Sequence, residues 1–286
     1  MRAFIQELRQ RYHPLFHARN SSFWRALIRV ADRPVWLSPP GIRFHVRGQL
    51  LTHGLTFALC GSQEPVAEAL AQVFLREFHF QSFWDIGANI GHYTWLMKSA
   101  VPELEVVMIE PVPANAELIK KTLERNRLSN TTLIVAAASD TSGEDTLRLD
   151  AISGLTSTIE KGVKTFEENH YGATARELQV KLVSIDEIRA GHLPIDFMKI
   201  DVEGHERSVL EGALKTIDQD QPVLLIECAH PAHTCLEVLR QHGYRVIDAE
   251  HLSLDCAEDS CNFFCIPQRY AGSIESLLRD AGYVAA

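Results

Sequence analysis

Residues 81–99, QSFWDIGANIGHYTWLMKS, decide the fold that we predict for this chain. The stretch begins with a short apolar run that carries Asp85 near its end, and it closes with apolar residues at helical spacing. Between the two lies a tight turn built on Gly87, Asn89 and Gly91. Glycines let a ligand approach the main chain closely, and the helix that follows points its N-terminus at that ligand. The pattern therefore predicts a strand, a ligand-binding loop and a helix.

A second apolar run, residues 104–109, ends in Glu110. In a doubly wound sheet, an acid at the end of the strand after the glycine loop accepts hydrogen bonds from ribose hydroxyls. Glu110 fits that role, although an acid at this place also serves as a cap for the next helix. The loop is not the dinucleotide fingerprint GxGxxG, because Asn89 and His92 stand where its second and third glycines would be. This departure disfavours a nicotinamide cofactor.

After the loop, apolar runs of strand length alternate with helical stretches, which is typical of a parallel sheet. Strands are expected over 104–109, 132–137, 145–149, 180–183, 195–200 and 223–226, with a closing pair at 244–247 and 262–266. Helices are expected over 114–126, 186–188 and 207–217, and residues 151–178 are expected to be an insertion that helps form a substrate pocket.

The residues before the loop predict a separate set of elements. Helices are expected over 1–33 and 64–78, a β-hairpin over 35–37 and 42–46, and a further strand over 55–59. We therefore predict an N-terminal extension of helix and hairpin over residues 1–60 and a ligand-binding domain over 61–286.

Composition limits the function classes. The chain has 286 residues, 46% of them apolar, which is enough for a large core. Residues 1–33 carry a net charge of +5, from seven arginines and two acids, within a total of −9. An acidic body argues against nucleic acid. For the basic head we favour an amphipathic helix packed on its own domain over contact with an anionic membrane surface.

No apolar run is long enough to cross a membrane, and the N-terminus lacks the apolar core of a secretion signal. A cytoplasmic protein is therefore expected. The six cysteines form no CxxC pair, and we interpret them as reduced thiols.

Carboxylates gather where the predicted strands end. In an open α/β sheet, ligands bind beyond the carboxyl ends of the strands, where the strand order reverses. Such a rim suits a cationic ligand, and the sulfonium of S-adenosylmethionine is cationic. A magnesium or calcium ion held by Asp201, Glu203 and Glu227 is an alternative that stays open. Lys199 is expected to pair with a rim carboxylate or to touch substrate. The rim comprises Asp85, Glu110, Asp140, Asp201, Glu203 and Glu227.

Three stretches resemble the FkbM family of S-adenosylmethionine-dependent methyltransferases: FWDIGANIGHYT, MIEPVPANAELIKKTLERN and DFMKIDVEGHERSVLEGA. The resemblance runs from about residue 64 to about residue 266, and IDVEGHE is its most specific part. It implies the class I methyltransferase fold, which is Rossmann-like α/β with a mostly parallel, seven-stranded sheet whose last strand runs antiparallel. It also implies methyl transfer to oxygen, commonly a hydroxyl of a sugar or a natural-product-like small molecule.

The resemblance further implies which residues hold S-adenosylmethionine. Asp85, Gly87, Asn89 and Gly91 would cradle the methionine part of the cofactor. Glu110 would hold the ribose, and Ser139 with Asp140 would lie against the adenine.

For the transfer, the acceptor oxygen must lie in line with the methyl group and lose its proton. The candidate bases are Asp201, Glu203, His205, Glu227 and His230. We favour Glu203 and His205, because they flank Gly204 in a turn that can face the cofactor. In the alternative interpretation, His205 only caps the next helix, and Glu206 and Glu211 lie on its solvated face.

Two other functions stay open beside an O-methyltransferase. A nicotinamide-dependent oxidoreductase shares the strand, loop and ribose acid, and a domain that binds its cofactor without turnover is the second. Methylation of protein or nucleic acid is disfavoured, because the turn after 195–200 reads DVEG and lacks the Asp/Asn-Pro-Pro-Tyr/Phe motif of amino-group methylation.

Overall fold

The computed structural model describes residues 30–61, 64–149, 157–158, 175–228, 234–251, 253 and 260–280. Some of our predictions concern residues outside these ranges: the basic head up to residue 29, His230 and most of the 151–178 insertion. None of the helices in the described ranges is long and apolar enough to cross a membrane.

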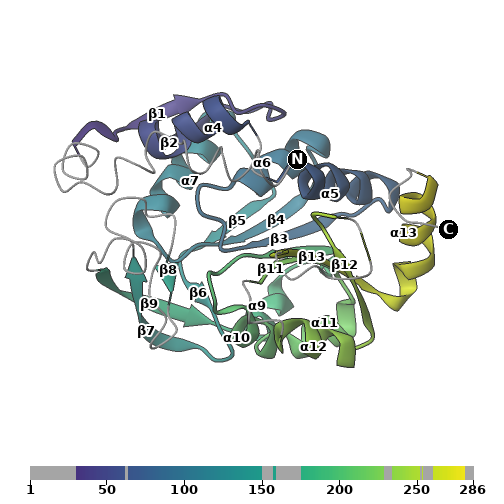
Figure 1. Ribbon diagram of the computed structural model, residues 1–286. Coiled ribbons are helices and arrows are strands. Elements are labelled where there is room, and N and C mark those ends of the chain that lie inside the picture. The colour runs from purple at the N-terminus through teal and green to yellow at the C-terminus, as the bar shows by residue number, and fades with distance from the viewer. Residues whose placement is uncertain are drawn as a thin grey trace.

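A seven-stranded sheet forms the centre of the molecule (Figure 1). Strand β13 runs antiparallel to both of its neighbours, and the other pairs are parallel. The mostly parallel sheet implied by the resemblance is therefore confirmed. Across the sheet the order is β12 (Tyr244–Asp248), β13 (Asn262–Pro267), β11 (Val223–Glu227), β10 (Phe197–Ile200), β3 (Ser82–Ile86), β4 (Glu105–Ile109) and β5 (Thr131–Ile134).

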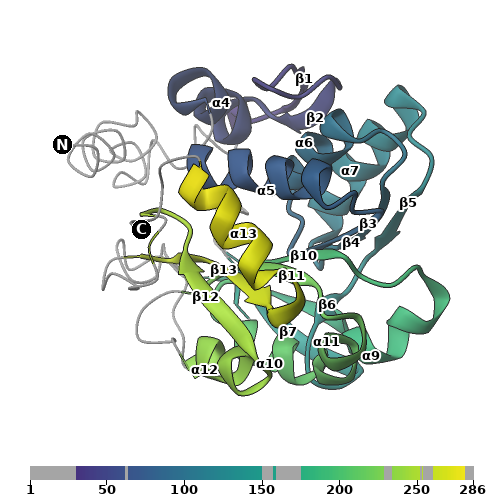
Figure 2. The same ribbon diagram turned by 90° about the vertical axis from the view of Figure 1, so that its right-hand side faces the viewer.

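Helices cover both faces of this sheet, as Figure 2 shows. One face carries α5 (Pro65–Glu77), α6 (His92–Ala100), α7 (Pro113–Asn126) and α13 (Gln268–Asp280). The other carries α9 (Ile185–Ile188), α10 (Glu206–Glu211), α11 (Leu214–Asp220) and α12 (Thr234–Gln241).

Alternate strand side chains enter two separate cores. Phe83 and Phe197 are fully buried in the first core, and their chain neighbours Trp84 and Met198 are fully buried in the second. A strand with both faces covered is apolar along its whole length, which explains the continuous apolar runs in the sequence.

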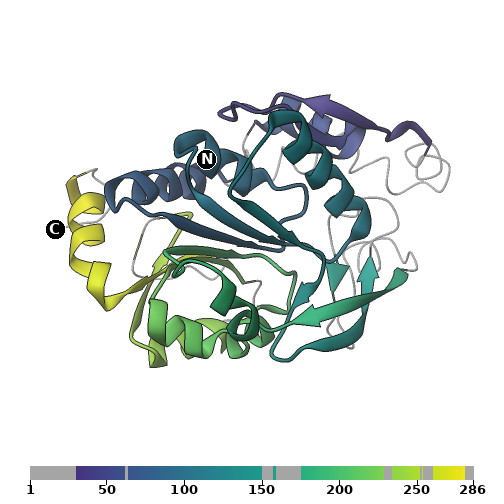
Figure 3. The ribbon, with the colours of Figure 1, turned by 180° about the vertical axis from the view of Figure 1, so that it is seen from behind.

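One predicted strand is wrong in its extent. Instead of running from 132 to 137, strand β5 ends at Ile134, and β6 (Ala137–Ala138) belongs to a second, four-stranded sheet (Figure 3). The chain leaves the central sheet because Ala137 pairs with Leu182 of β9 (Arg176–Val183). That sheet is completed by β7 (Gly143–Leu149) and β8 (Ser157–Thr158).

The predicted hairpin near the N-terminus is confirmed, with its second strand shifted. Strands β1 (Pro34–Leu37) and β2 (Val46–Gln49) pair antiparallel. The strand predicted over 55–59 is wrong, because the π-helix η1 (Leu50–Gly54) continues directly into helix α4 (Leu55–Cys60). Asp32 starts this helical segment by accepting a hydrogen bond of 2.7 Å from the backbone N–H of Leu51.

Two further corrections concern a helix and a pair of cysteines. The helix predicted over 207–217 is divided into α10 and α11 at Gly212, where a Cβ atom would come within 2.0 Å of the Ser139 carbonyl oxygen. Cys228 and Cys235 form a disulfide, against the expectation of reduced thiols.

Candidate functional site

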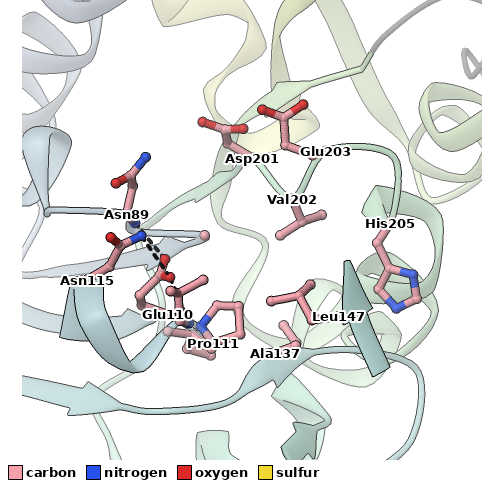
Figure 4. A pocket seen from close by; sticks show the side chains of 14 residues that line it. Asn89, Glu110, Pro111, Asn115, Ala137, Leu147, Asp201, Val202, Glu203 and His205 are labelled. Atoms are coloured by element: carbon pink, nitrogen blue, oxygen red, sulfur yellow. Dashed lines mark hydrogen bonds between the residues drawn. The ribbon is translucent and has the colours of Figure 1, made fainter. Parts of the chain in front are cut away.

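A pocket that encloses about 640 Å³ of space, part of it open to solvent, lies at the carboxyl ends of β3, β4 and β10 (Figure 4). The chain runs outward from β3 to β4 and β5, and then returns on the other side of β3 as β10. The pocket therefore lies where the strand order reverses, as the sequence predicted. Its lining includes the predicted site residues Gly87, Asn89, Glu110, Asp201, Glu203 and His205, and also Asn115, Ala137, Ala138, Leu147 and Val202, which the sequence analysis missed.

Glu110 is held at the tip of β4 by uncharged donors. Its Oε2 accepts a hydrogen bond of 2.8 Å from the Asn89 backbone N–H, and its Oε1 accepts one of 2.9 Å from the backbone N–H of Val112. The Asn115 side chain donates a third bond, of 3.3 Å. Burial raises the pKa of Glu110 to about 7, although these three donors oppose the shift. Glu110 thus titrates near neutrality.

Close packing requires glycine at two positions of the loop. Gly87 has a φ of +79°, and a Cβ atom there would come within 1.8 Å of the Asp201 carbonyl oxygen. At Gly91, with a φ of +85°, a Cβ atom would meet the Trp95 ring at 2.7 Å. Gly91 precedes helix α6 and does not line the pocket.

Asp85 is buried and faces the helix instead of the pocket. Its carboxylate accepts hydrogen bonds from the Thr94 hydroxyl, at 2.7 Å, and from the Thr94 backbone N–H, at 3.2 Å. Burial raises the pKa of Asp85, and Lys199 opposes that shift. Asp85 is therefore bound to the helix that follows the loop and is not among the residues that line the pocket.

Lys199 occupies the centre of a buried group of acids. Its Nζ lies 2.6 Å from Asp201 Oδ2 and 4.9 Å from the centre of the Tyr93 ring. The predicted pairing with a rim carboxylate is confirmed. Burial alone would lower the pKa of Lys199, but Asp201, Asp85 and Glu64 together raise it above its usual value. Lys199 is therefore a cation at neutral pH.

Glu64, which the sequence analysis did not single out, joins this group from the start of α5. It accepts a hydrogen bond of 2.5 Å from the Tyr93 hydroxyl and one of 3.4 Å from the Asn262 side chain. Burial raises the pKa of Glu64, and Lys199 opposes the shift. No sequence motif surrounds Glu64, and its partners Tyr93 and Asn262 are distant in the sequence. Its place in this group could therefore be found only from the fold.

Glu227 lies beside Asp201, because the residues that precede them, Ile226 and Ile200, are partners in the sheet. The negative charge of Asp201, followed by burial and the charge of Glu64, raises the pKa of Glu227 well above its usual value. The shift favours the protonated form of Glu227 more than in an ordinary glutamate.

The turn after β10 separates Glu203 from His205. Glu203 and Gly204 both have left-handed backbone conformations, with φ of +55° and +98°. In Figure 4 the carboxylates of Asp201 and Glu203 point the same way, and the His205 imidazole points the opposite way. His205 Nε2 lies 2.9 Å from the Ser139 hydroxyl, and the imidazole makes no capping bond to α10. The two favoured bases are thus both at the pocket, but on different sides of it.

Four other residues named in the sequence analysis do not line the pocket. Ser139 is buried and Asp140 is exposed, and both follow the pocket-lining Ala138. Glu206 was expected on a solvated helix face, which is wrong: it is buried and accepts a hydrogen bond of 2.8 Å from the Gly204 backbone N–H. That bond fixes the turn that carries Glu203. Glu211 is exposed, as expected, and pairs with Arg207 at 2.9 Å.

The metal alternative gains no support from geometry. Within the parts of the chain that the structure describes, no three or more His, Cys, Asp or Glu side chains are grouped so that they could hold a metal ion. Lys199 occupies one oxygen of Asp201, the central member of the proposed ligand set.

Among curated proteins, the chain is 29% identical over 154 residues to "Methyltransferase sdnD" of Sordaria araneosa, covering 45% of this chain and 58% of that protein. It is 24% identical over 147 residues to "Methyltransferase 1" of Beauveria bassiana, covering 45% and 56%. The chain therefore spans less than two thirds of the length of these two relatives.

Two solved structures resemble the chain at low identity. One is a methyltransferase FkbM from Methylobacillus flagellatus, with 22% identity, coverage of 65% and 43%, and a TM-score of 0.44. The other is an O-methyltransferase from Bacillus cereus in complex with SAH, with 13% identity, coverage of 75% and 87%, and a TM-score of 0.42. Likenesses of this strength say nothing about substrate.

The decisive comparison is with the family described as "Methyltransferase FkbM domain", which matches residues 85–246. That range is more than half of the chain, and it contains the glycine loop, Glu110 and the whole turn after β10. The chain belongs to the FkbM methyltransferase family.

Proposed function

We propose that the chain is an S-adenosylmethionine-dependent O-methyltransferase, and that its acceptor is a hydroxyl of a sugar or of a natural-product-like small molecule. The observation that carries the proposal is the position of Glu110. This carboxylate lies at the strand tip beside the glycine loop, lines the pocket and is oriented by the loop's own Asn89 N–H at 2.8 Å. An acid placed there suits a ribose.

The residues in the pocket fit the proposed cofactor. Glu110 holds the ribose hydroxyls, and the main chain at Gly87 with the Asn89 side chain faces the amino-acid part. Asn89 lines the pocket, and its side-chain Oδ1 is buried without a hydrogen-bond partner among the described residues. The apolar wall formed by Ala137 and Leu147 suits an adenine ring. When bound, S-adenosylmethionine supplies a methyl group on a cationic sulfur.

Glu203 is the group that we assign as the base. It lines the pocket at the end of β10, in a left-handed conformation that places its carboxylate beside that of Asp201. Asp201 is paired with Lys199, and we assign Glu203 as the acceptor for the proton of a substrate hydroxyl. The oxygen that loses this proton takes the methyl group, and S-adenosylhomocysteine is released.

The other functions make different predictions. A nicotinamide-dependent oxidoreductase would bind NAD and not S-adenosylhomocysteine, and membership of the FkbM family speaks against it. A domain without turnover would bind S-adenosylhomocysteine and transfer no methyl group to any acceptor. Partners such as nucleic acid play no part in the proposal, because the acceptor is a small molecule or a glycan.

The test has two parts. Calorimetry with S-adenosylhomocysteine and with NAD identifies the cofactor class, and we expect binding of the first only. Labelled S-adenosylmethionine is then offered with nucleotide sugars, glycans and polyketide-like alcohols, using Glu203→Gln as the matched control. Label on an acceptor oxygen with wild type, and its loss with Glu203→Gln, supports the proposal.

Label on a nitrogen, carbon or sulfur atom would contradict O-methylation. Addition of EDTA to the active reaction decides the metal question. We expect no loss of activity, because Lys199 already neutralises Asp201.

A further inference from the structure

The N-terminal extension packs directly on the glycine loop, although it lies outside the family match, which begins at residue 85. Gly48 of β2 makes this approach possible. A Cβ atom at Gly48 would come within 3.3 Å of the His53 Cβ and 3.4 Å of Ile90 Cδ1, a loop residue. Figures 1 and 2 show β1, β2 and α4 lying together over the helices α6 and α7.

Hydrogen bonds fix the extension on these helices. The backbone N–H of Arg47 donates to the Thr122 hydroxyl at 2.9 Å, and that of Arg43 donates to the Ser99 hydroxyl at 3.0 Å. Asp32 holds the first turn of η1. His53 is therefore presented to the glycine loop by a firmly docked segment.

The protonation of His53 follows from its surroundings. Burial lowers the pKa of His53 to about 4, against smaller raising effects of Asp32 and Asn89, so the ring is neutral at physiological pH. Its Nδ1 accepts a hydrogen bond of 2.9 Å from the Gln49 backbone N–H. A neutral imidazole that accepts at Nδ1 carries its proton on Nε2, so Nε2 is a donor.

The donor on His53 and an acceptor on Asn89 complement each other. Nε2 of His53 and Oδ1 of Asn89 are both buried, and within the described ranges neither makes a hydrogen bond of normal geometry. The Asn89 side chain is nevertheless close enough to raise the pKa of the imidazole. A donor and an acceptor buried together in this way gain by closing on each other when the loop is occupied.

We propose that His53 is a positioning residue for the cofactor: its Nε2–H holds the side-chain oxygen of Asn89, so that Asn89 Nδ2 donates to the carboxylate of the cofactor's amino-acid part. This inference rests on the proposed function. It makes the extension a working part of the site, because Asn89 also orients Glu110 through its backbone N–H.

Two ligands separate this role from a general structural one. S-adenosylhomocysteine carries the amino-acid carboxylate, and 5′-methylthioadenosine lacks it. We expect His53→Phe, which keeps an aromatic ring and loses the donor, to raise the Kd for S-adenosylhomocysteine about tenfold, the value of one lost hydrogen bond to a ligand site. The Kd for 5′-methylthioadenosine should stay within about twofold. His53→Gln, which restores a donor, should recover part of the loss.

Matched controls keep the test decisive. Thr52→Val removes a buried contact between η1 and Asp32 without touching Asn89, so it should lower stability and leave the ratio of the two Kd values unchanged. If His53→Phe does not fold, Asn89→Asp replaces it: this change keeps the acceptor for His53, places a negative charge against the ligand carboxylate and should weaken S-adenosylhomocysteine selectively.

Equal binding of S-adenosylhomocysteine by wild type and the His53 variants, or equal weakening of both ligands, overturns the role of His53. Failure of wild type to bind either ligand overturns the proposed function instead.

Discussion

Two acidic walls of the pocket, the first at Glu110 and the second at Asp201 and Glu203, differ in what surrounds their carboxylates. Glu110 receives its three hydrogen bonds from uncharged donors, and no lysine or arginine takes part in them. Asp201 forms an ion pair with the buried cation Lys199. Asp85 and Glu64 also interact with the positive charge of Lys199. Uncharged donors can fix the orientation of a carboxylate that accepts hydrogen bonds from hydroxyl groups. A buried cation, in contrast, offsets the repulsion among several neighbouring carboxylates. In our proposal, Glu110 therefore binds the cofactor, and the group around Asp201 takes part in the methyl transfer.

The largest expected effect concerns the cation of the second wall. Lys199→Met leaves the buried Asp85 and the half-buried Asp201 without their counter-charge, and should cost about 3–5 kcal/mol of the free energy of unfolding. Urea denaturation at neutral pH measures it. Adding Asp85→Asn to this variant should recover part of the loss. A cost below about 1 kcal/mol for the single change would show that Lys199 does not organise the acids.

The next effect is on turnover, and it separates the two walls. Glu203→Gln should lower kcat about 10²- to 10⁴-fold, because it removes the proton acceptor and keeps the shape of the side chain. The Kd for S-adenosylhomocysteine should stay within about twofold of wild type. Rapid-quench measurement of methyl transfer and calorimetry check the two halves. If Glu203→Gln loses both cofactor binding and turnover, the two walls do not have separate roles.

Much of the fold was predictable because its causes are local. Strands such as β3 and β10 are covered on both faces, so their apolar runs are continuous and easily found. The end of β5 was not predictable, because β6 leaves the sheet to pair with Leu182, far along the chain. The short apolar run over 55–59 fits a strand as well as a helix. It is helical because it continues η1, whose first turn is bonded to Asp32.

The site was predictable where a strand tip carries its own functional residue. Glu110, Asp201 and Glu203 follow their strands directly and reach the pocket for that reason. Glu64 and His53 were not found, because each comes from before the loop and meets the site only through tertiary packing. Asp85 and Gly91 match the family motif, yet they support the loop from outside the pocket lining.

The smallest effect is on the pH dependence of the first wall. Glu110 has a pKa of about 7, so it is mostly protonated at pH 6 and mostly ionised at pH 8. A protonated Glu110 accepts fewer hydrogen bonds from ribose, and affinity must therefore fall as pH falls. We expect the Kd for S-adenosylhomocysteine to rise about tenfold from pH 8 to pH 6. Glu110→Gln should remove this dependence. A rise of Kd with increasing pH would contradict the assignment.

The central claim is that the pocket beside Glu110 is the cofactor site, and calorimetric titration with S-adenosylhomocysteine tests it most directly. Wild type should bind with one site per chain, and Glu110→Ala should bind at least about tenfold more weakly while keeping its fold. If Glu110→Ala binds as tightly as wild type, the cofactor lies elsewhere and the account is wrong.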